Sequence, residues 1–324
     1  METQIVIKPG FRPPDQKAIK QTGHMLGGLQ KHQRIPVVDI LPPDRKISCR
    51  SEQGKLKTAV VSLPTYLDWG LKPTNKTSEA NIDNKPDRLE AVMEHKKLIM
   101  TLHNFGVDLV ILRPSEEKLS GVYTRDIAVT IGDKLIRANL KSPLRLSEEA
   151  SFEGGIKPPR EVLLEGGNVF LEGCKNLVFV GVGDRTNDEA IDWLQGILGT
   201  EYEVKSIKLK AGVLHLDCVF SPIKATGTSN GAALVYKAGF ENENDLRFLM
   251  SIYGTLFDVS KAEFKMLGPN TLALDENTRV VNPNCAQVIS FLTENGQKVI
   301  PIKLDEIIKG GGYSRCSVMP LSRE

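Results

Sequence analysis

The side chains of this chain that could carry out covalent chemistry lie in four short segments far apart in the sequence. Cys316 follows the run GGGYSR, a flexible, glycine-rich and cationic setting that favours the thiolate form of a nucleophilic cysteine. Asp126 closes the run YTRD, Glu165 lies in LEGGN, and His215 and Asp217 lie in LHLD. In chain order these segments supply Asp, Glu, His, Asp and Cys, which are the residue types of nucleophilic and acid/base catalysis.

Each of these residues also has a plain structural interpretation. Glu165 precedes two glycines, where a backbone can approach a ligand closely, but an exposed Glu in an ordinary turn fits equally. His215 and Asp217 are expected in a strand-like run over 214–220, on one face by the period of two, and a hydrogen-bonded histidine without a catalytic role is the alternative. Asp126 is expected at the start of the apolar strand 127–131, and a surface Arg-Asp pair is its alternative.

Two arginines are candidates for binding an anionic end of a substrate. Arg145 follows a proline turn, and Arg185 lies in GDRTN directly before an expected helix. An arginine binds a carboxylate through two parallel hydrogen bonds, and a helix start adds positive potential. A solvated surface position is the alternative for either one.

Composition excludes several classes of protein. The 324 residues carry a formal net charge of +2, which gives no electrostatic case for nucleic acid or membrane partners. No apolar run could span a bilayer, and the first residues do not resemble a signal peptide, so a cytoplasmic protein is expected. The five cysteines are widely spaced and predict free thiols. Without C-x-x-C or H-x-x-x-H pairs or a nucleotide-binding glycine motif, we expect no metal and no cofactor. The sequence leaves open whether the protein forms a homo-oligomer.

The chain divides into an extension, residues 1–54, and a single catalytic domain, residues 55–324. The extension is rich in Pro-Pro, Gly-Gly, Lys and Gln, and predicts either an arm with a short helix over 16–26 or an irregular cover on the domain. The domain begins with a strand over 57–63, a polar loop over 65–85 suited to a lid, a helix over 86–105 and a strand over 107–112.

Beyond residue 112, paired strands alternate with helices about five times, which predicts a repeat architecture. The expected hairpins cover 127–138 and 162–182, a helix begins at Asn187 and ends at Leu198, and later strands and helices follow the same order. The remaining strands are expected over 204–209, 214–220, 232–236, 257–259, 271–274, 279–281 and 298–302, with helices over 243–253 and 286–294.

Carboxylates, a histidine and a cysteine together suit one substrate particularly well. A guanidinium group is a planar cation whose N–H groups need carboxylates, whose central carbon needs a soft nucleophile, and whose leaving amine needs a proton. The expected partner is therefore a small molecule that carries a guanidino group.

On these motifs the sequence resembles the guanidine-modifying superfamily: arginine deiminases, dimethylarginine dimethylaminohydrolases and amidinotransferases. The resemblance covers about residues 55–324 and includes TRD, EGG, GDRTN, HLD and GGGYSRC. It implies an α/β fold, a five-fold pseudosymmetric propeller of ββαβ units (a pentein), around a central pocket. Residues 1–54 have no counterpart in it.

Two features bear on the subgroup. HLD and RCSVMPLSRE resemble arginine deiminases and dihydrolases, whereas the length resembles dimethylaminohydrolases, which lack an inserted helical domain. Asn168 stands where the superfamily commonly has Asp, which affects hydrogen bonding in that turn.

The resemblance implies a hydrolase in which Asp126 and Asp217 hold the guanidinium, Cys316 attacks it, and His215, oriented by Glu165, transfers protons. Arg145 and Arg185 would bind the α-carboxylate. Dimethylarginine hydrolysis and amidino transfer use the same covalent intermediate and are alternatives. A propeller that binds arginine without turnover is the alternative outside enzymes.

Overall fold

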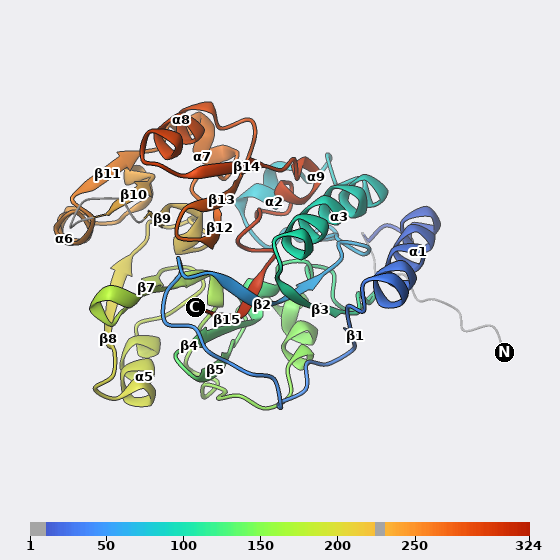
Figure 1. Cartoon of the computed structure of the whole chain (residues 1–324), viewed down its shortest axis with the longest axis horizontal. Coiled ribbons are helices and arrows are strands. Elements are labelled where there is room, and N and C mark those ends of the chain that lie inside the picture. The colour runs from blue at the N-terminus through green and yellow to red at the C-terminus, as the bar shows by residue number, and fades with distance from the viewer. Residues whose placement is uncertain (1–10, 224–230) are drawn as a thin grey trace.

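The computed structural model describes residues 11–223 and 231–324, and within them the strands form five small sheets (Figure 1). The first sheet has the order β1-β3-β2-β15, the second is the pair β4-β5, and the other three have three strands each. The strands are β1 (Val37–Val38), β2 (Leu56–Ser62), β3 (Asp108–Leu112), β4 (Ala128–Ile131), β5 (Lys134–Arg137), β6 (Val169–Glu172), β7 (Leu177–Val182), β8 (Glu203–Lys208), β9 (Phe220–Ile223), β10 (Ala232–Val235), β11 (Thr255–Asp258), β12 (Leu272–Asp275), β13 (Thr278–Val281), β14 (Lys298–Pro301) and β15 (Met319–Arg323).

Helices connect the strands and cover the outside of the sheets. The α-helices are α1 (Gln16–His32), α2 (Lys76–Ala80), α3 (Arg88–Asn104), α4 (Thr124–Ile127), α5 (Glu189–Leu198), α6 (Glu243–Tyr253), α7 (Lys261–Lys265), α8 (Ala286–Glu294) and α9 (Asp305–Ile308). Short 3-10 turns are η1 (Pro143–Ser151), η2 (Gly166–Asn168), η3 (Gly173–Lys175), η4 (Leu216–Cys218) and η5 (Lys237–Gly239). Among the described residues, no helix combines the length and apolar character needed to cross a membrane.

One strand order recurs in four of the sheets. An antiparallel pair is followed by a helix and then by a strand parallel to the second member of the pair. This is the order of β6, β7, α5 and β8, of β9, β10, α6 and β11, and of β12, β13, α8 and β14. In the first sheet the C-terminal strand β15 supplies the antiparallel partner of β2, and α3 leads to the parallel strand β3. The recurring order agrees with the expected alternation of paired strands and helices.

The helices begin and end where local chemistry indicates. The Asp87 side chain caps α3 by accepting from the N–H of Glu90, and Gly106 follows the helix with a φ of +83°. The expected helix over 86–105 is therefore confirmed. The expected cap at Asn187 is wrong: α5 begins at Glu189, and the Asn187 side chain accepts instead from the N–H of Leu163.

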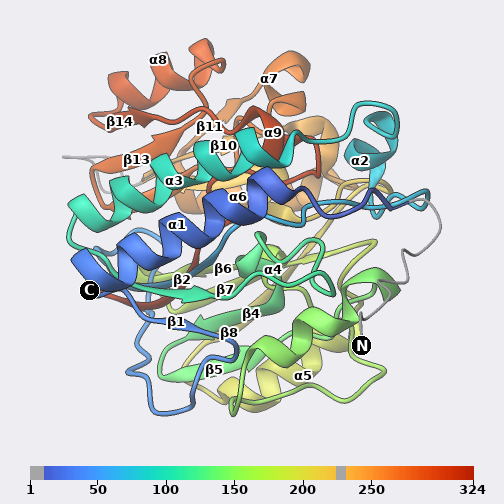
Figure 2. The same cartoon turned by 90° about the vertical axis from the view of Figure 1, so that its right-hand side faces the viewer.

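The described part of the N-terminal segment packs against the domain. Helix α1 is longer than expected and lies along α3 on one side of the molecule (Figures 1 and 2). Strand β1 adds to the edge of the first sheet beside β3. Buried apolar residues of α1 join those of α3 in one core, among them Met25, Leu29 and Leu98. The described residues thus cover the domain, and the expected helix over 16–26 is part of α1; the division at residue 54 stays a prediction.

Several expected strands and loops differ in the structure. The expected loop over 65–85 contains the helix α2, whose first turn is closed by a capping box between Asn75 and Ser78. The expected strand over 162–171 is restricted to β6, which η2 precedes, and the expected strand over 214–220 is the turn η4 followed by β9. Asp126 lies in the short helix α4 and not at a strand start.

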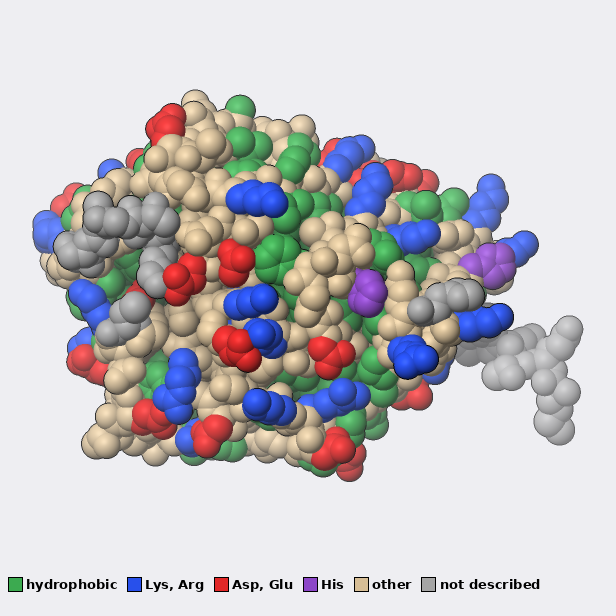
Figure 3. Space-filling view, in the orientation of Figure 1, with side chains coloured by type: hydrophobic (Ala, Val, Ile, Leu, Met, Phe, Trp, Pro, Cys, Tyr) green, Lys and Arg blue, Asp and Glu red, His purple; other side chains and the backbone are tan. Residues whose placement is uncertain are grey.

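Charged side chains of both signs are interspersed over the face shown in Figure 3.

Candidate active site

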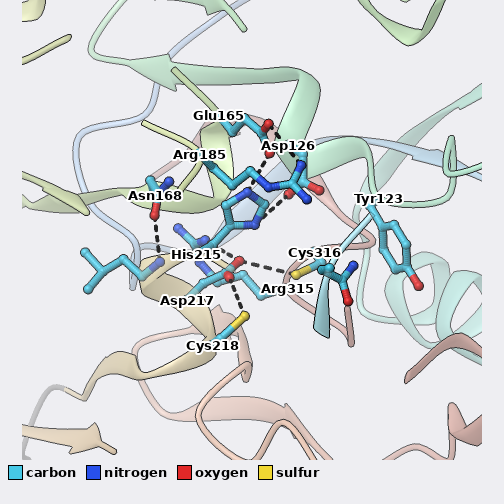
Figure 4. Close-up of polar contacts among 12 residues, drawn as sticks. Tyr123, Asp126, Glu165, Asn168, Arg185, His215, Asp217, Cys218, Arg315 and Cys316 are labelled. Carbon is cyan, nitrogen blue, oxygen red and sulfur yellow. Dashed lines mark hydrogen bonds and ion pairs between the residues drawn. The ribbon is translucent and has the colours of Figure 1, made fainter. Parts of the chain in front are cut away.

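The structure brings the five candidate residues together in the interior (Figure 4). Asp126 comes from α4, Glu165 directly precedes η2, His215 and Asp217 lie at η4, and Cys316 lies between α9 and β15. Their exposed fractions are 0 to 2 %. Residues separated by nearly two hundred positions thus share one buried site.

Cys316 is held tightly from two sides. Its Sγ lies 3.1 Å from Nδ2 of Asn270, which donates to it, and 3.4 Å from Oδ2 of Asp217, to which the thiol can donate. The glycines before it permit close packing, because a Cβ on Gly312 would lie 2.5 Å from the ring of Tyr123. The segment is packed against its neighbours and buried, and is not the flexible segment that its composition predicts.

The expectation that this setting favours a thiolate is wrong. Burial raises the pKa of the Cys316 thiol well above its ordinary value, and the charges of Asp217 and Asp126 raise it further. The cation that the sequence places beside it, Arg315, is itself paired with Asp217 and Glu52. These contacts therefore favour the protonated thiol.

His215 forms an ion pair with Glu165. Its Nε2 lies 2.7 Å from Oε2 of Glu165, and its Nδ1 lies 3.6 Å from Oδ1 of Asp126. Burial lowers the pKa of His215, but Asp126 and Glu165 outweigh it and the net shift is upward. Burial raises the pKa of Glu165, and the hydrogen bond and charge of His215, with Arg185 and Arg145, lower it to about 2.

The local turn, and not a strand, orients His215 and Asp217. His215 is extended and begins η4, and the N–H of Leu216 donates to Oδ1 of Asn168 at 2.8 Å. The expectation of two side chains on one strand face is therefore wrong. A Cβ on Gly167 would lie 2.6 Å from Nδ1 of His215, which explains the second glycine of the EGG motif.

Arg145 and Arg185 both lie at the site, in different settings. Arg145 donates to Oδ2 of Asp126 at 2.7 Å and to Oε2 of Glu148 at 2.8 Å, and all three side chains are buried. Arg185 lies 3.4 Å from Oε1 of Glu165, and its Nη2 donates to the carbonyl of Thr74. Arg145 thus already has two carboxylates, whereas Arg185 faces the loop that was expected to be a lid.

Two neighbouring cavities share lining residues, and Cys316 lines the inner one. The inner one has a volume of about 10 Å³ and is lined by residues that include Asp126, Arg145, Arg185 and Cys316. The outer one, about 560 Å³, shares Thr74, Asn75, Arg185 and Leu214 with it. Asn75 donates to the carbonyl of Gly310 at 2.9 Å, so the loop closes over the glycine-rich segment.

Asp126, Glu165 and His215 form the one group in residues 11–223 and 231–324 whose potential metal-ligand atoms all lie within 4.8 Å of one another. Nε2 of His215 is hydrogen-bonded to Glu165, and Asp126 is paired with Arg145. These contacts account for the cluster as an ion-pair network, and we assign no metal ligand in it.

A family model described as "N,N dimethylarginine dimethylhydrolase, eukaryotic" matches residues 71–323. The chain belongs to this family. It is therefore a member of the guanidine-modifying superfamily, as the sequence motifs indicate.

The relatives of this family member include an uncharacterized protein and proteins with named activities. The uncharacterized protein YkgA of Bacillus subtilis (strain 168) is 32% identical over 294 residues, covering 88% of this chain and 99% of YkgA. The bifunctional arginine dihydrolase/ornithine cyclodeaminase AgrE of Nostoc sp. is 26% identical, over 75% of this chain and 35% of AgrE. The arginine deiminase of Levilactobacillus brevis is 25% identical, over 62% and 61% of the two chains.

Solved structures share the fold. The N-terminal domain of ArgZ, an arginine dihydrolase from cyanobacteria, superposes with a TM-score of 0.72 at 20% identity and covers 82% of this chain and 98% of that domain. SxtG, an amidinotransferase from Microseira wollei, superposes with a TM-score of 0.67 at 20% identity, over 86% and 97%. The family member thus has the mixed α/β pentein fold.

Three residues at the site of this family member were not foreseen from the sequence. Asn270 binds Sγ and the backbone N–H of Cys316, Tyr123 packs against the glycines, and Glu52 binds Arg315. Only the turn LGPN before β12 signals Asn270, and nothing distinguishes it from a surface asparagine.

Proposed function

We propose that the protein hydrolyses a guanidinium C–N bond of arginine or a close derivative through a covalent thiouronium on Cys316. The observation that carries this proposal is the inner cavity. It is lined by both Asp126 and Cys316, and Oδ1 of Asp126 is buried without a hydrogen-bond partner among the described residues. Nδ1 of His215 lies 3.6 Å from this oxygen, beyond hydrogen-bond distance, so the oxygen can accept from an N–H group of a planar cation bound beside the thiol.

In this proposal the substrate cation activates its own nucleophile. The guanidinium lies between Asp126 and Asp217, and its positive charge offsets the two carboxylates that raise the thiol pKa. The entering cation replaces the thiol proton as the counter-charge for Asp217, and the proton leaves to solvent. Cys316 then becomes a thiolate only when a substrate is present.

The thiolate attacks the central guanidinium carbon and forms a C–S bond. His215, whose raised pKa keeps it protonated, gives a proton to the departing nitrogen, and the C–N bond breaks to leave a thiouronium. Neutral His215 then takes a proton from a water molecule, whose oxygen bonds to the same carbon. The C–S bond breaks, the added hydroxyl group gives its proton to the released sulfur, and the products are a ureido compound, an amine and the regenerated thiol. These steps use no cofactor.

Glu165 would orient His215, and the arginines would bind the carboxylate end of the substrate. Of the two, Arg185 is better placed, because it lines both cavities and its contact with Thr74 can be exchanged when the loop moves. Arg145 is held by Asp126 and Glu148, and its charge would mainly fix Asp126. The outer cavity would hold the amino-acid end.

We also propose that the five sheets form a five-fold α/β propeller around this site. The recurring strand order in four sheets supports it, and so does the C-terminal strand that completes the first sheet. In the second sheet, the parallel bridge between Ile136 and Ile156 lies where a third strand would lie.

A panel of substrates tests the activity: arginine, methylated arginines, agmatine and guanidinoacetate, with the products weighed by mass spectrometry. Citrulline from arginine supports hydrolysis, and ornithine from arginine in addition indicates a dihydrolase. Dimethylamine from dimethylarginine favours the dimethylarginine reaction suggested by the family model. Product only in the presence of an acceptor amine favours amidino transfer, and binding without any product favours the non-catalytic alternative.

A further inference from the structure

Glu52 comes from the N-terminal segment, before the residues that the family model matches, and reaches the centre of the molecule. Its N–H donates to the carbonyl of Leu171 in β6 at 3.1 Å. Nearby, Cys49 pairs with Gly132 and Ser48 with Ser322, so the segment runs across three sheets. This anchoring fixes the position of the buried Glu52 side chain.

The Glu52 carboxylate neutralises arginines. Its Oε1 accepts from Nη2 of Arg315 at 3.1 Å and from Nη1 of Arg125 at 3.4 Å. Burial raises the pKa of Glu52, but Arg125, Arg315 and Arg323 outweigh burial and lower it to about 2, so the group is ionised. Nε and Nη2 of Arg125 have no hydrogen-bond partner among the described residues.

Arg315 links Glu52 to the site, because it contacts both Glu52 and Asp217. Its Nη2 also donates to the carbonyl of Val169 at 2.8 Å, and its guanidinium lies 3.7 Å from the centre of the Phe170 ring. Its Nη1 donates to Oδ2 of Asp217 at 3.0 Å, and the same oxygen lies 3.4 Å from Sγ of Cys316. Figure 4 labels Arg315, Asp217 and Cys316 and draws the contact between Asp217 and Cys316 as a dashed line.

We propose that Glu52 is a positioning residue: it holds Arg315 for Asp217 and sets the net charge beside Cys316. The charged groups that face the thiol are Asp217, Asp126 and the guanidinium of Arg315, with the Cys218 thiol also near. Behind them, Glu52 offsets part of the charge of Arg315 and Arg125. Without its negative charge the potential at the sulfur becomes more positive, and the thiol loses its proton more readily.

The test measures the rate at which iodoacetamide alkylates Cys316, followed by mass mapping of its peptide at a fixed pH below the thiol pKa. Glu52→Gln keeps the shape and the acceptor oxygen and removes the charge. A unit charge in the same ion-pair network changes a pKa by roughly one unit at the effective dielectric of proteins, so alkylation is expected to be about tenfold faster. An unchanged or slower rate in the folded variant overturns the proposal.

Arg125→Gln is the matched opposite change. It removes a positive charge from the same ion pair, and alkylation is expected to be about tenfold slower. The double variant Glu52→Gln/Arg125→Gln removes one charge of each sign, and its rate is expected to return to that of the wild type. A double variant that stays at the rate of either single variant contradicts a charge effect and indicates disruption of the packing.

Circular dichroism establishes whether each variant folds. If Glu52→Gln alone does not fold, the comparison between Arg125→Gln and the double variant still decides, because the double variant leaves no unpaired buried charge from this ion pair. Equal alkylation rates in those two variants overturn the proposal.

This inference rests on the proposed function only in naming Cys316 as the nucleophile. Alkylation reports the ionisation of the thiol whether or not arginine is hydrolysed. A protein that turns over none of the guanidino compounds would overturn the proposed function and leave the alkylation result standing. Conversely, normal turnover with no alkylation effect would overturn only the role of Glu52.

Discussion

Asn270 donates from Nδ2 to Sγ of Cys316 at 3.1 Å, and its Oδ1 accepts from the N–H groups of both Arg315 and Cys316. Nδ2 also lies 3.2 Å from the carbonyl of Asp217. One amide side chain therefore ties together the segment that carries the thiol and the turn that carries the carboxylate beside it.

Asn270→Ala is expected to lower kcat and to destabilise the protein by about 1–3 kcal/mol, because two buried N–H groups lose their acceptor. Asn282→Ala is the matched control. Asn282 is also buried, accepts from the N–H of Asn284 and donates to the carbonyl of Met266, away from the site. It is expected to destabilise without lowering kcat in the folded protein. Equal effects of the two variants on kcat would show that Asn270 has only a structural role.

Cys316→Ser is expected to abolish turnover while the thermal unfolding curve stays close to that of the wild type, since a hydroxyl is a far poorer nucleophile. In the wild type, an acid quench during turnover is expected to trap an adduct on the peptide that contains Cys316. Turnover by the folded serine variant, or an adduct on Cys218 instead, would assign the nucleophile elsewhere.

His215→Ala is expected to reduce kcat by a factor on the order of 10²–10⁴, the usual contribution of general acid–base catalysis, with substrate binding largely retained. Single-turnover kinetics and equilibrium dialysis of substrate separate the two effects. A raised KM with an unchanged kcat would mean that His215 binds the substrate and does not transfer protons.

The pH dependence of kcat tests the pair of Glu165 and His215. Burial lowers the pKa of His215 and the two carboxylates Asp126 and Glu165 raise it by more, so His215 stays protonated to a higher pH than an ordinary histidine. Activity that needs the protonated form is therefore lost as the pH rises through that raised pKa. Glu165→Gln removes one carboxylate and is expected to move this alkaline limb to lower pH. A limb that does not move would separate Glu165 from the titration of His215.

The residue types of the site could be predicted from the sequence, but their local conformations and charge states could not. The motifs that contain Asp126, Glu165, His215 and Cys316 are short, and each can be recognised in the sequence alone. The turn at His215 depends on Asn168, whose side chain accepts from Leu216, and a strand-like pattern cannot show that contact. The protonated thiol follows from burial and from Asp217 and Asp126, which the fold brings to Cys316 from distant segments.

Among the secondary-structure elements, too, those set by local signals could be predicted and those set by distant contacts could not. The long helix α3 was predicted because its cap and its closing glycine are local signals. The role of the N-terminal segment was not foreseen, because the partners of Glu52, Arg125 and Arg315, follow it by 73 and 263 positions. The composition left an arm and a cover as alternatives, and only tertiary contacts show how the segment packs.

The last prediction concerns the choice of substrate. With the guanidinium between Asp126 and Asp217, each terminal nitrogen donates its N–H groups to a carboxylate. An asymmetrically dimethylated nitrogen has lost both donors, which leaves a buried carboxylate oxygen unpaired at a cost of about 1–3 kcal/mol or more. We expect kcat/KM for arginine to exceed that for asymmetric dimethylarginine by roughly tenfold or more, since 1.4 kcal/mol corresponds to one decade.

Competition between the two substrates in one reaction measures this ratio directly. Ammonia reports turnover of arginine, dimethylamine reports turnover of the dimethylated substrate, and the two are quantified separately. Faster turnover of the dimethylated substrate would mean that Asp217 does not pair with that nitrogen, and would favour the dimethylarginine reaction that the family model describes.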